Sequence, residues 1–245
     1  MFVWLASAAS PQPAPKLAAA ERGRVAVGFY KAGQQLFSSE QFELAAEEFG
    51  KATAEDPLFT LAYYQAGQAY MNLRRYPDAI RAFQECLQST RALYDLAAGD
   101  RQAADRQRDD EMRAIRESLV EIQAKAAKRP DSGYPMMLMY VQQQLAALEK
   151  TRASTDATYR PPPEVLLALG SAFFRNGDRD AAEVEWRAAI EVNPKLGEAH
   201  NNLAVIYMTS GRYSEAEAEV KAAEKTGFRV NPQFKEDLKK AASGR

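Results

Sequence analysis

The sequence predicts an all-α fold, a solenoid of helix-turn-helix units with an inserted long helical hairpin and a C-terminal capping helix. Two observations support this fold class. Small and aromatic residues recur with a period of 34 residues, and apolar residues stand three or four apart between glycine and proline breaks. With 46% hydrophobic and 27% charged residues, the chain of 245 residues is able to bury a core.

The sequence divides into five segments. We expect a signal-like stretch and Pro-rich linker at 1–24, two repeat units at 25–91, a helical hairpin at 92–160, two further units at 161–228, and a capping helix with a tail at 229–245.

The period is visible in both pairs of units. Seven residues of the first unit recur 34 positions later, namely Ala32, Gly33, Leu36, Phe42, Ala45, Phe49 and Ala52 as Ala66, Gly67, Tyr70, Tyr76, Ala79, Phe83 and Cys86. The third and fourth units repeat Leu169, Gly170, Phe173, Gly177, Ala182, Trp186 and Ala189 as Leu203, Ala204, Tyr207, Gly211, Ala216, Val220 and Ala223. Glycines at 177 and 211 provide turns between paired helices.

Small residues occupy the places where paired helices must approach closely. On the first helices these are Gly33, Gly67, Gly170 and Ala204, and on the second helices Ala45, Ala79, Ala182 and Ala216. We expect leucine at Gly67 or Gly170 to force the helices apart and alanine there to be tolerated.

These residues resemble the tetratricopeptide-repeat (TPR) family, of bacterial type, in their order and in the 34-residue unit. The chain departs from the family pattern at the first signature position, which holds Phe29, Tyr63, Leu166 and His200, and it lacks the closing proline after two units. The resemblance implies a stack of helix pairs whose first helices line a concave groove for a protein or peptide.

The insertion between the two pairs contains two amphipathic stretches. Apolar residues follow 3,4 spacing at Met112, Ile115, Leu119, Ile122 and Ala126, and again at Leu138, Val141, Leu145 and Leu148. The stretches predict an antiparallel hairpin. Three interpretations remain: a degenerate pair of repeats that continues the stack, a projecting arm for a partner or for self-association, or a flexible linkage.

The two ends differ in character. Residues 232–240 predict a capping helix with Phe234 and Leu238 on its apolar face. The first nine residues carry no charge and contain Ala6-Ser7-Ala8, which has the form of a signal peptidase site. This start favours a periplasmic or secreted protein, with a cytoplasmic protein as the alternative.

The chemical inventory argues against catalysis. The chain has one histidine, His200, one cysteine, Cys86, and no glycine-rich phosphate loop. We therefore expect no enzyme activity, no cofactor and no metal, with His200 and Cys86 as packing residues. A net charge of −1 gives no electrostatic footprint for nucleic acid, and no stretch is long enough to span a membrane.

The predicted function is a non-catalytic scaffold that binds a partner segment in the TPR groove, in the cell envelope. The alternative is a structural homo-oligomer assembled through the hairpin at 112–148. By resemblance, the groove residues are Tyr30, Gln34, Phe37, Tyr64, Gln68, Met71, Leu167, Ser171, Phe174, Asn201, Val205 and Met208. Because these are aromatic, apolar and amide side chains, we expect an apolar or helical partner segment rather than an acidic terminus.

Overall fold

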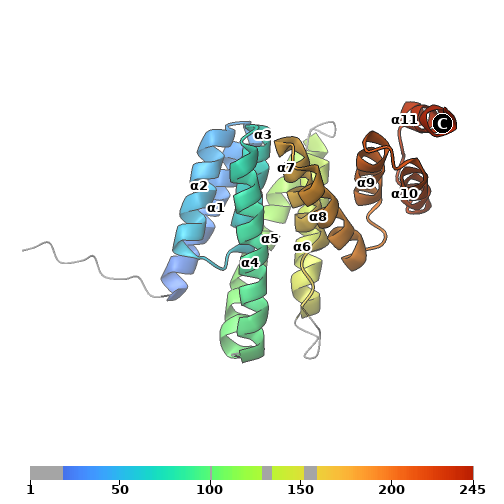
Figure 1. The fold of residues 1–245 in the computed structure, drawn as a ribbon. Helices are drawn as coiled ribbons and strands as arrows, with labels where there is room; N and C mark the ends of the chain where they lie inside the picture. Colours follow the sequence, from blue (N-terminus) through green and yellow to red (C-terminus); the bar gives the residue numbers. More distant parts are fainter. Residues whose placement is uncertain (1–18, 100, 129–133, 152–158, 245) are drawn as a thin grey trace, which may run out of the picture.

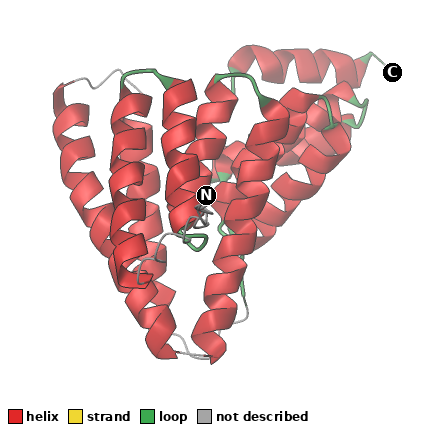
Figure 2. Cartoon of the chain, turned by 90° about the vertical axis from the view of Figure 1, so that its left-hand side faces the viewer, coloured by secondary structure: helices red, strands yellow, loops and turns green. Residues whose placement is uncertain are grey.

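The computed structural model describes residues 19–99, 101–128, 134–151 and 159–244. The signal-like start and the Pro-rich linker up to residue 18 lie outside the described residues. Every element in Figure 2 is a helix, and the described part of the chain contains no strand. The predicted all-α class is therefore confirmed.

Eight helices form the four expected pairs (Figure 1). The first two units are α1 (Ala19–Ser38) with α2 (Phe42–Glu55) and α3 (Thr60–Asn72) with α4 (Tyr76–Gly99). The last two are α7 (Pro163–Asn176) with α8 (Arg179–Val192) and α9 (Gly197–Thr209) with α10 (Tyr213–Lys225). The capping helix is α11 (Pro232–Ser243), where Asn231 accepts a hydrogen bond from the Gln233 amide and Leu238 is buried.

Aromatic rings of the second helices lie directly against the glycines of the first. A Cβ atom built at Gly33 would lie 2.6 Å from Cε1 of Phe49, and one at Gly67 would lie 2.5 Å from Cε1 of Phe83. At Gly170 it would lie 2.6 Å from Cδ1 of Trp186. The expectation that alanine is tolerated at Gly67 and Gly170 is therefore wrong, because even a methyl group requires a buried ring to move.

The turn inside each unit places one residue in the left-handed region. In the later units this residue is Gly177 (φ 93°) or Gly211 (φ 74°), as the sequence predicts. In the first two units the same place holds Glu40 (φ 59°) and Arg74 (φ 58°). Residues with a side chain rarely adopt this backbone conformation. The turns at Glu40 and Arg74 therefore carry backbone strain that the glycine turns avoid.

The insertion forms the expected hairpin, with α5 (Arg101–Lys128) and α6 (Tyr134–Thr151) packed against each other. It does not continue the stack, because α4 packs directly against α7 and so joins the second unit to the third (Figure 1). The interpretation as a degenerate pair of stacked repeats is therefore wrong. The hairpin does not project freely either, since α5 contacts α1 and α3 and α6 contacts α3.

Both apolar faces of the hairpin are used in this packing. Ile115 and Val141 are fully buried, and Ile122 is 4% exposed. They share one core cluster with Tyr30 and Tyr64 of the first helices. The ring of Tyr140 stacks on that of Tyr64, with centroids 3.8 Å apart and planes 10° from parallel.

Polar contacts set the register of α5 on the stack. Gln107 donates to Asp56 Oδ2 at 2.5 Å, and Ser118 donates to Gln34 Oε1 at 2.9 Å. Lys31 forms an ion pair with Glu117 at the exposed edge. Between these contacts, Glu111 Oε1 accepts a hydrogen bond of 2.5 Å from Thr60 Oγ1, at the first turn of α3.

Glu111 is a buried carboxyl, with only 5% of its surface exposed. Burial raises its pKa from 4.5 to about 7, since loss of solvent disfavours the charged form. Thr60, the Leu61 amide and Arg108 act in the opposite direction, while the charge of Asp56 adds to the rise. The folded chain therefore holds this proton to a higher pH than the unfolded chain does.

Substitution of Gly67 tests the close helix contact. Gly67→Ala should lower the free energy of unfolding by about 1 to 3 kcal/mol, because the ring of Phe83 must shift in a packed core. Gly50→Ala on α2 is the matched control, since a Cβ there meets nothing within 4 Å and alanine favours the helix by about 0.5 to 1 kcal/mol. Urea unfolding measures both, and equal stability of the two variants would contradict the ring-on-glycine contact.

Glu111 should make stability fall as pH rises. The folded pKa is higher than the unfolded one, so the contribution is complete below pH 4.5 and is lost as pH approaches 7. Glu111→Gln stays neutral and can still accept from Thr60. The variant should therefore lack this fall in stability. Above pH 7 its free energy of unfolding should exceed that of the wild type by an amount on the order of 2 kcal/mol.

Urea unfolding at pH 5, 6, 7 and 8 measures this effect. Glu121→Gln, an exposed position on the same helix, should keep the pH dependence of the wild type. If Glu111→Gln and Glu121→Gln show the same pH dependence, Glu111 is not the titrating group.

Candidate partner-binding groove

The twelve predicted groove residues lie on the first helices of the four units, α1, α3, α7 and α9. The structure separates them into two sets. Six residues on α1 and α3 belong to the part of the stack that the hairpin covers. The other six, on α7 and α9, do not.

Three of the six residues on α1 and α3 are buried. Tyr30 has no exposed surface, and Gln34 and Tyr64 are 8% and 9% exposed. Gln34 donates to the Tyr30 hydroxyl at 3.0 Å and accepts from Ser118 of α5, while Tyr64 lies under Tyr140 of α6. The chain's own hairpin therefore occupies the face that the sequence assigned to a partner.

The remaining residues of this set are half-buried. Gln68 donates to the Tyr64 hydroxyl at 2.8 Å, Phe37 contacts Phe42 edge-on with centroids 5.1 Å apart, and Met71 packs against the first core cluster. Each of these three side chains is thus engaged within the chain.

The set on α7 and α9 keeps part of its surface exposed. We call it the α7/α9 face, and its members are Leu167, Ser171, Phe174, Asn201, Val205 and Met208, all half-buried. The apolar cluster beneath this face, which extends to α11, contains no hairpin residue among those described. Phe174 rests on Trp186 with ring centroids 5.7 Å apart, so its position is set from below.

The sequence analysis does not predict that the hairpin covers α1 and α3, although the pattern of apolar residues is consistent with this packing. The apolar stripes of the hairpin, which include Ile115 and Val141, must pack against another apolar surface. The side chains of Tyr30 and Tyr64 provide such a surface. The sequence does not show that α4 packs directly against α7. Because of this contact the hairpin is not needed to join the second and third units, and it packs on α1 and α3 instead.

Two arginines at the turns between paired helices, Arg75 and Arg212, form ion pairs within the stack. Arg212 donates to Glu183 at 2.9 Å, forms an ion pair with Glu215, and lies over the Tyr207 ring at 4.1 Å. Arg75 makes the corresponding set with Glu43, Asp78 and Tyr70. The same arrangement in two units indicates a structural role in joining adjacent helices.

His200 and Cys86 are packing residues, as expected. The His200 ring lies between Glu219 Oε2 at 2.6 Å and the Pro194 carbonyl at 3.2 Å. Cys86 is 2% exposed, and burial raises the pKa of its thiol well above the ordinary range, which keeps the thiol protonated.

The described residues show neither a metal-binding cluster nor a membrane-spanning helix. Among them, no group of three or more histidine, cysteine, aspartate or glutamate side chains could hold a metal ion. None of the described helices has the length and apolar character needed to cross a membrane.

Several solved structures are similar to this chain. PilW, a type IV pilus biogenesis factor, is 15% identical with a TM-score of 0.41, covering 89% of this chain and 86% of PilW. TTC0263, a thermophilic TPR protein of Thermus thermophilus, is 18% identical with a TM-score of 0.29, covering 89% and 98%. YrrB, a TPR protein with an unusual peptide-binding site, is 19% identical with a TM-score of 0.31, covering 88% and 92%.

No curated protein matches the chain. The tetratricopeptide-repeat family model matches residues 30–92 and 167–228, which together make up more than half of the sequence. These ranges fall on the four pairs of helices that flank the hairpin, two pairs on each side. The chain therefore belongs to the tetratricopeptide-repeat family.

Proposed function

We propose that the protein is a non-catalytic scaffold that binds a segment of a partner protein on the α7/α9 face. The observation that carries this proposal is the difference between the two halves of the stack. The hairpin packs on the first helices of the first two units, where three of the six predicted residues are buried. All six corresponding residues of the last two units keep part of their surface exposed. A partner segment that binds in the TPR groove therefore has more accessible surface on the last two units than on the first two.

The side chains of the α7/α9 face define the chemistry of the partner. Leu167, Phe174, Val205 and Met208 are apolar, and Asn201 adds an amide that can donate and accept. No charged residue belongs to the face. An apolar or helical segment fits this surface, with binding that depends weakly on salt.

A second candidate function is a structural homo-oligomer assembled through the hairpin. The inner faces of α5 and α6 are already buried, so this function requires the outer faces. Val120 and Met139 favour it, since they are 68% and 55% exposed. Light scattering on the purified chain distinguishes a monomeric scaffold from such an assembly.

We further propose that the protein works in the cell envelope. The support is the uncharged start with Ala6-Ser7-Ala8, followed by a Pro-rich stretch. N-terminal sequencing of the native protein should then find a mature chain that begins near Ala9. An intact Met1 form in the cytoplasm would contradict export.

Substitution on the α7/α9 face tests the scaffold proposal once a partner has been captured from native cells. Phe174→Ala should weaken binding by about 1 to 3 kcal/mol, because Phe174 is the one aromatic side chain among the six residues of the face. Val184→Ala on α8 is the matched control, since this side chain is 62% exposed and lies outside the face. Isothermal titration at two salt concentrations measures the affinities.

A covalent link tests whether the hairpin has to leave for the partner to bind. Lys31→Cys and Glu117→Cys replace an ion pair between α1 and α5, and a short bismaleimide can join the two exposed thiols. The linked chain should bind as tightly as the unlinked one. Loss of binding only after linking would place the contact under the hairpin, and normal binding by Phe174→Ala would contradict the α7/α9 face.

A further inference from the structure

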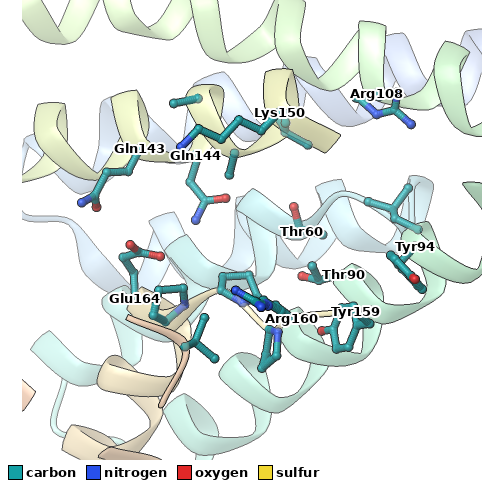
Figure 3. A pocket seen from close by; sticks show the side chains of 18 of the residues that line it. Thr60, Thr90, Tyr94, Arg108, Gln143, Gln144, Lys150, Tyr159, Arg160 and Glu164 are labelled. Atoms are coloured by element: carbon teal, nitrogen blue, oxygen red, sulfur yellow. The ribbon is translucent and has the colours of Figure 1, made fainter. Parts of the chain in front are cut away.

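A cavity of about 880 Å³ lies where the hairpin meets the stack (Figure 3). Its walls come from α3, α4, α5, α6, α8 and the segment that leads into and begins α7. Gln143 and Gln144 of α6 lie across the cavity from Thr90 of α4 and from Tyr159. This volume lies within the range of about 300 to 1,000 Å³ that is usual for ligand sites.

Glu111 is part of the cavity wall, and one of its oxygens has no partner. Oε1 is bound by Thr60, but Oε2 has no hydrogen-bond partner although it is fully enclosed. Buried polar atoms are almost always hydrogen-bonded, so an orphan of this kind needs an explanation. Because Oε2 is enclosed, a ligand in the cavity meets it only when the Glu111 side chain turns toward the cavity. The ligand can then donate to the carboxylate or accept from the carboxylic acid.

The charges around the cavity disfavour an ion as that ligand. Glu111 and Glu164 stand in the lining together with Arg108, Lys150 and Arg160. A cation would meet the three basic groups, and an anion would meet Glu164 and, when it is ionised, Glu111. A neutral ligand that both donates and accepts hydrogen bonds avoids either repulsion.

The rest of the lining matches the groups of a peptide. The amides of Gln143 and Gln144 can donate and accept, as the N–H and C=O groups of a peptide backbone require. The hydroxyls of Thr90 and Tyr159 donate to carbonyls of the chain and keep lone pairs for an incoming N–H. Leu93, Leu148 and the prolines at 161–163 provide apolar surface for side chains, which a polyol would not use.

We propose that this cavity binds a short, extended and uncharged peptide segment through its backbone amides. The site is distinct from the α7/α9 face, and none of its residues belongs to that face. It exists only because the hairpin, both pairs of repeats and the segment entering α7 meet at one place. The proposal therefore adds a second site to a scaffold and does not depend on the first.

The test uses the full chain with 13C-labelled alanine methyl groups. The probe is a pool of acetylated and amidated tetrapeptides made of uncharged residues. Ala97 and Ala146 line the cavity, so their methyl signals should shift and saturate, while Ala188 of α8 should not respond. Putrescine, succinate and sucrose serve as cationic, anionic and polyol probes and should leave all three signals unchanged.

Two variants give the test its control. Ala146→Trp places a large ring at the cavity wall and should weaken peptide binding at least about tenfold. Ala124→Trp, at an exposed position of α5 outside the cavity, should have no effect. If Ala146→Trp is misfolded by circular dichroism, Gln144→Leu replaces it, with an expected loss of about three- to tenfold.

Three results would overturn the proposal. These are the absence of any shift with the peptide pool, shifts with a charged or polyol probe that equal those with peptide, and unchanged binding by the folded cavity variants. Peptide shifts confined to the α7/α9 face would also overturn it, while leaving the scaffold proposal intact.

Discussion

The contact between a glycine and an aromatic ring inside each of the first three units is the constraint on which the architecture depends. With no side chain at Gly33, Gly67 or Gly170, the ring of Phe49, Phe83 or Trp186 can lie against the backbone of the first helix. The paired helices then approach closely and turn their remaining apolar residues toward the neighbouring unit. In the fourth unit Ala204 and Val220 hold the corresponding places, where a smaller aliphatic group leaves room for a methyl.

A stack built in this way leaves a concave face lined by the first helices. In units one and two that face carries two large aromatic side chains, Tyr30 and Tyr64. Their burial away from water lowers the free energy of the folded chain. The hairpin supplies the cover within the same chain, at a high effective concentration, because both of its ends are tied to the stack. Open binding surface is thereby concentrated on the last two units.

Polar groups inside the hairpin contact favour one register over others. Ser118 meets Gln34 and Glu111 meets Thr60, so a shift of α5 by one turn would leave several buried polar atoms without partners. Glu111 contributes this specificity at a cost in free energy when it is ionised, which its raised pKa records. The unpaired Oε2 shows that the fit between hairpin and stack is incomplete at one point, and the cavity lies there.

The sequence by itself determined the helical units, their pairing and the presence of a hairpin, because a 34-residue period and 3,4 spacings are local consequences of helix geometry. It also identified the glycines at the helix contacts, although the severity of those contacts appeared only with the rings of Phe83 and Trp186 in place. Left-handed turns at Glu40 and Arg74 escaped it, since neither residue type signals that conformation. The position of the hairpin was decided by tertiary structure alone. An amphipathic stripe such as Met112 to Ile122 states that a helix must be covered, but not by which surface. That choice rests on contacts between residues more than 80 positions apart, such as Gln34 and Ser118, and these contacts close half of the predicted groove.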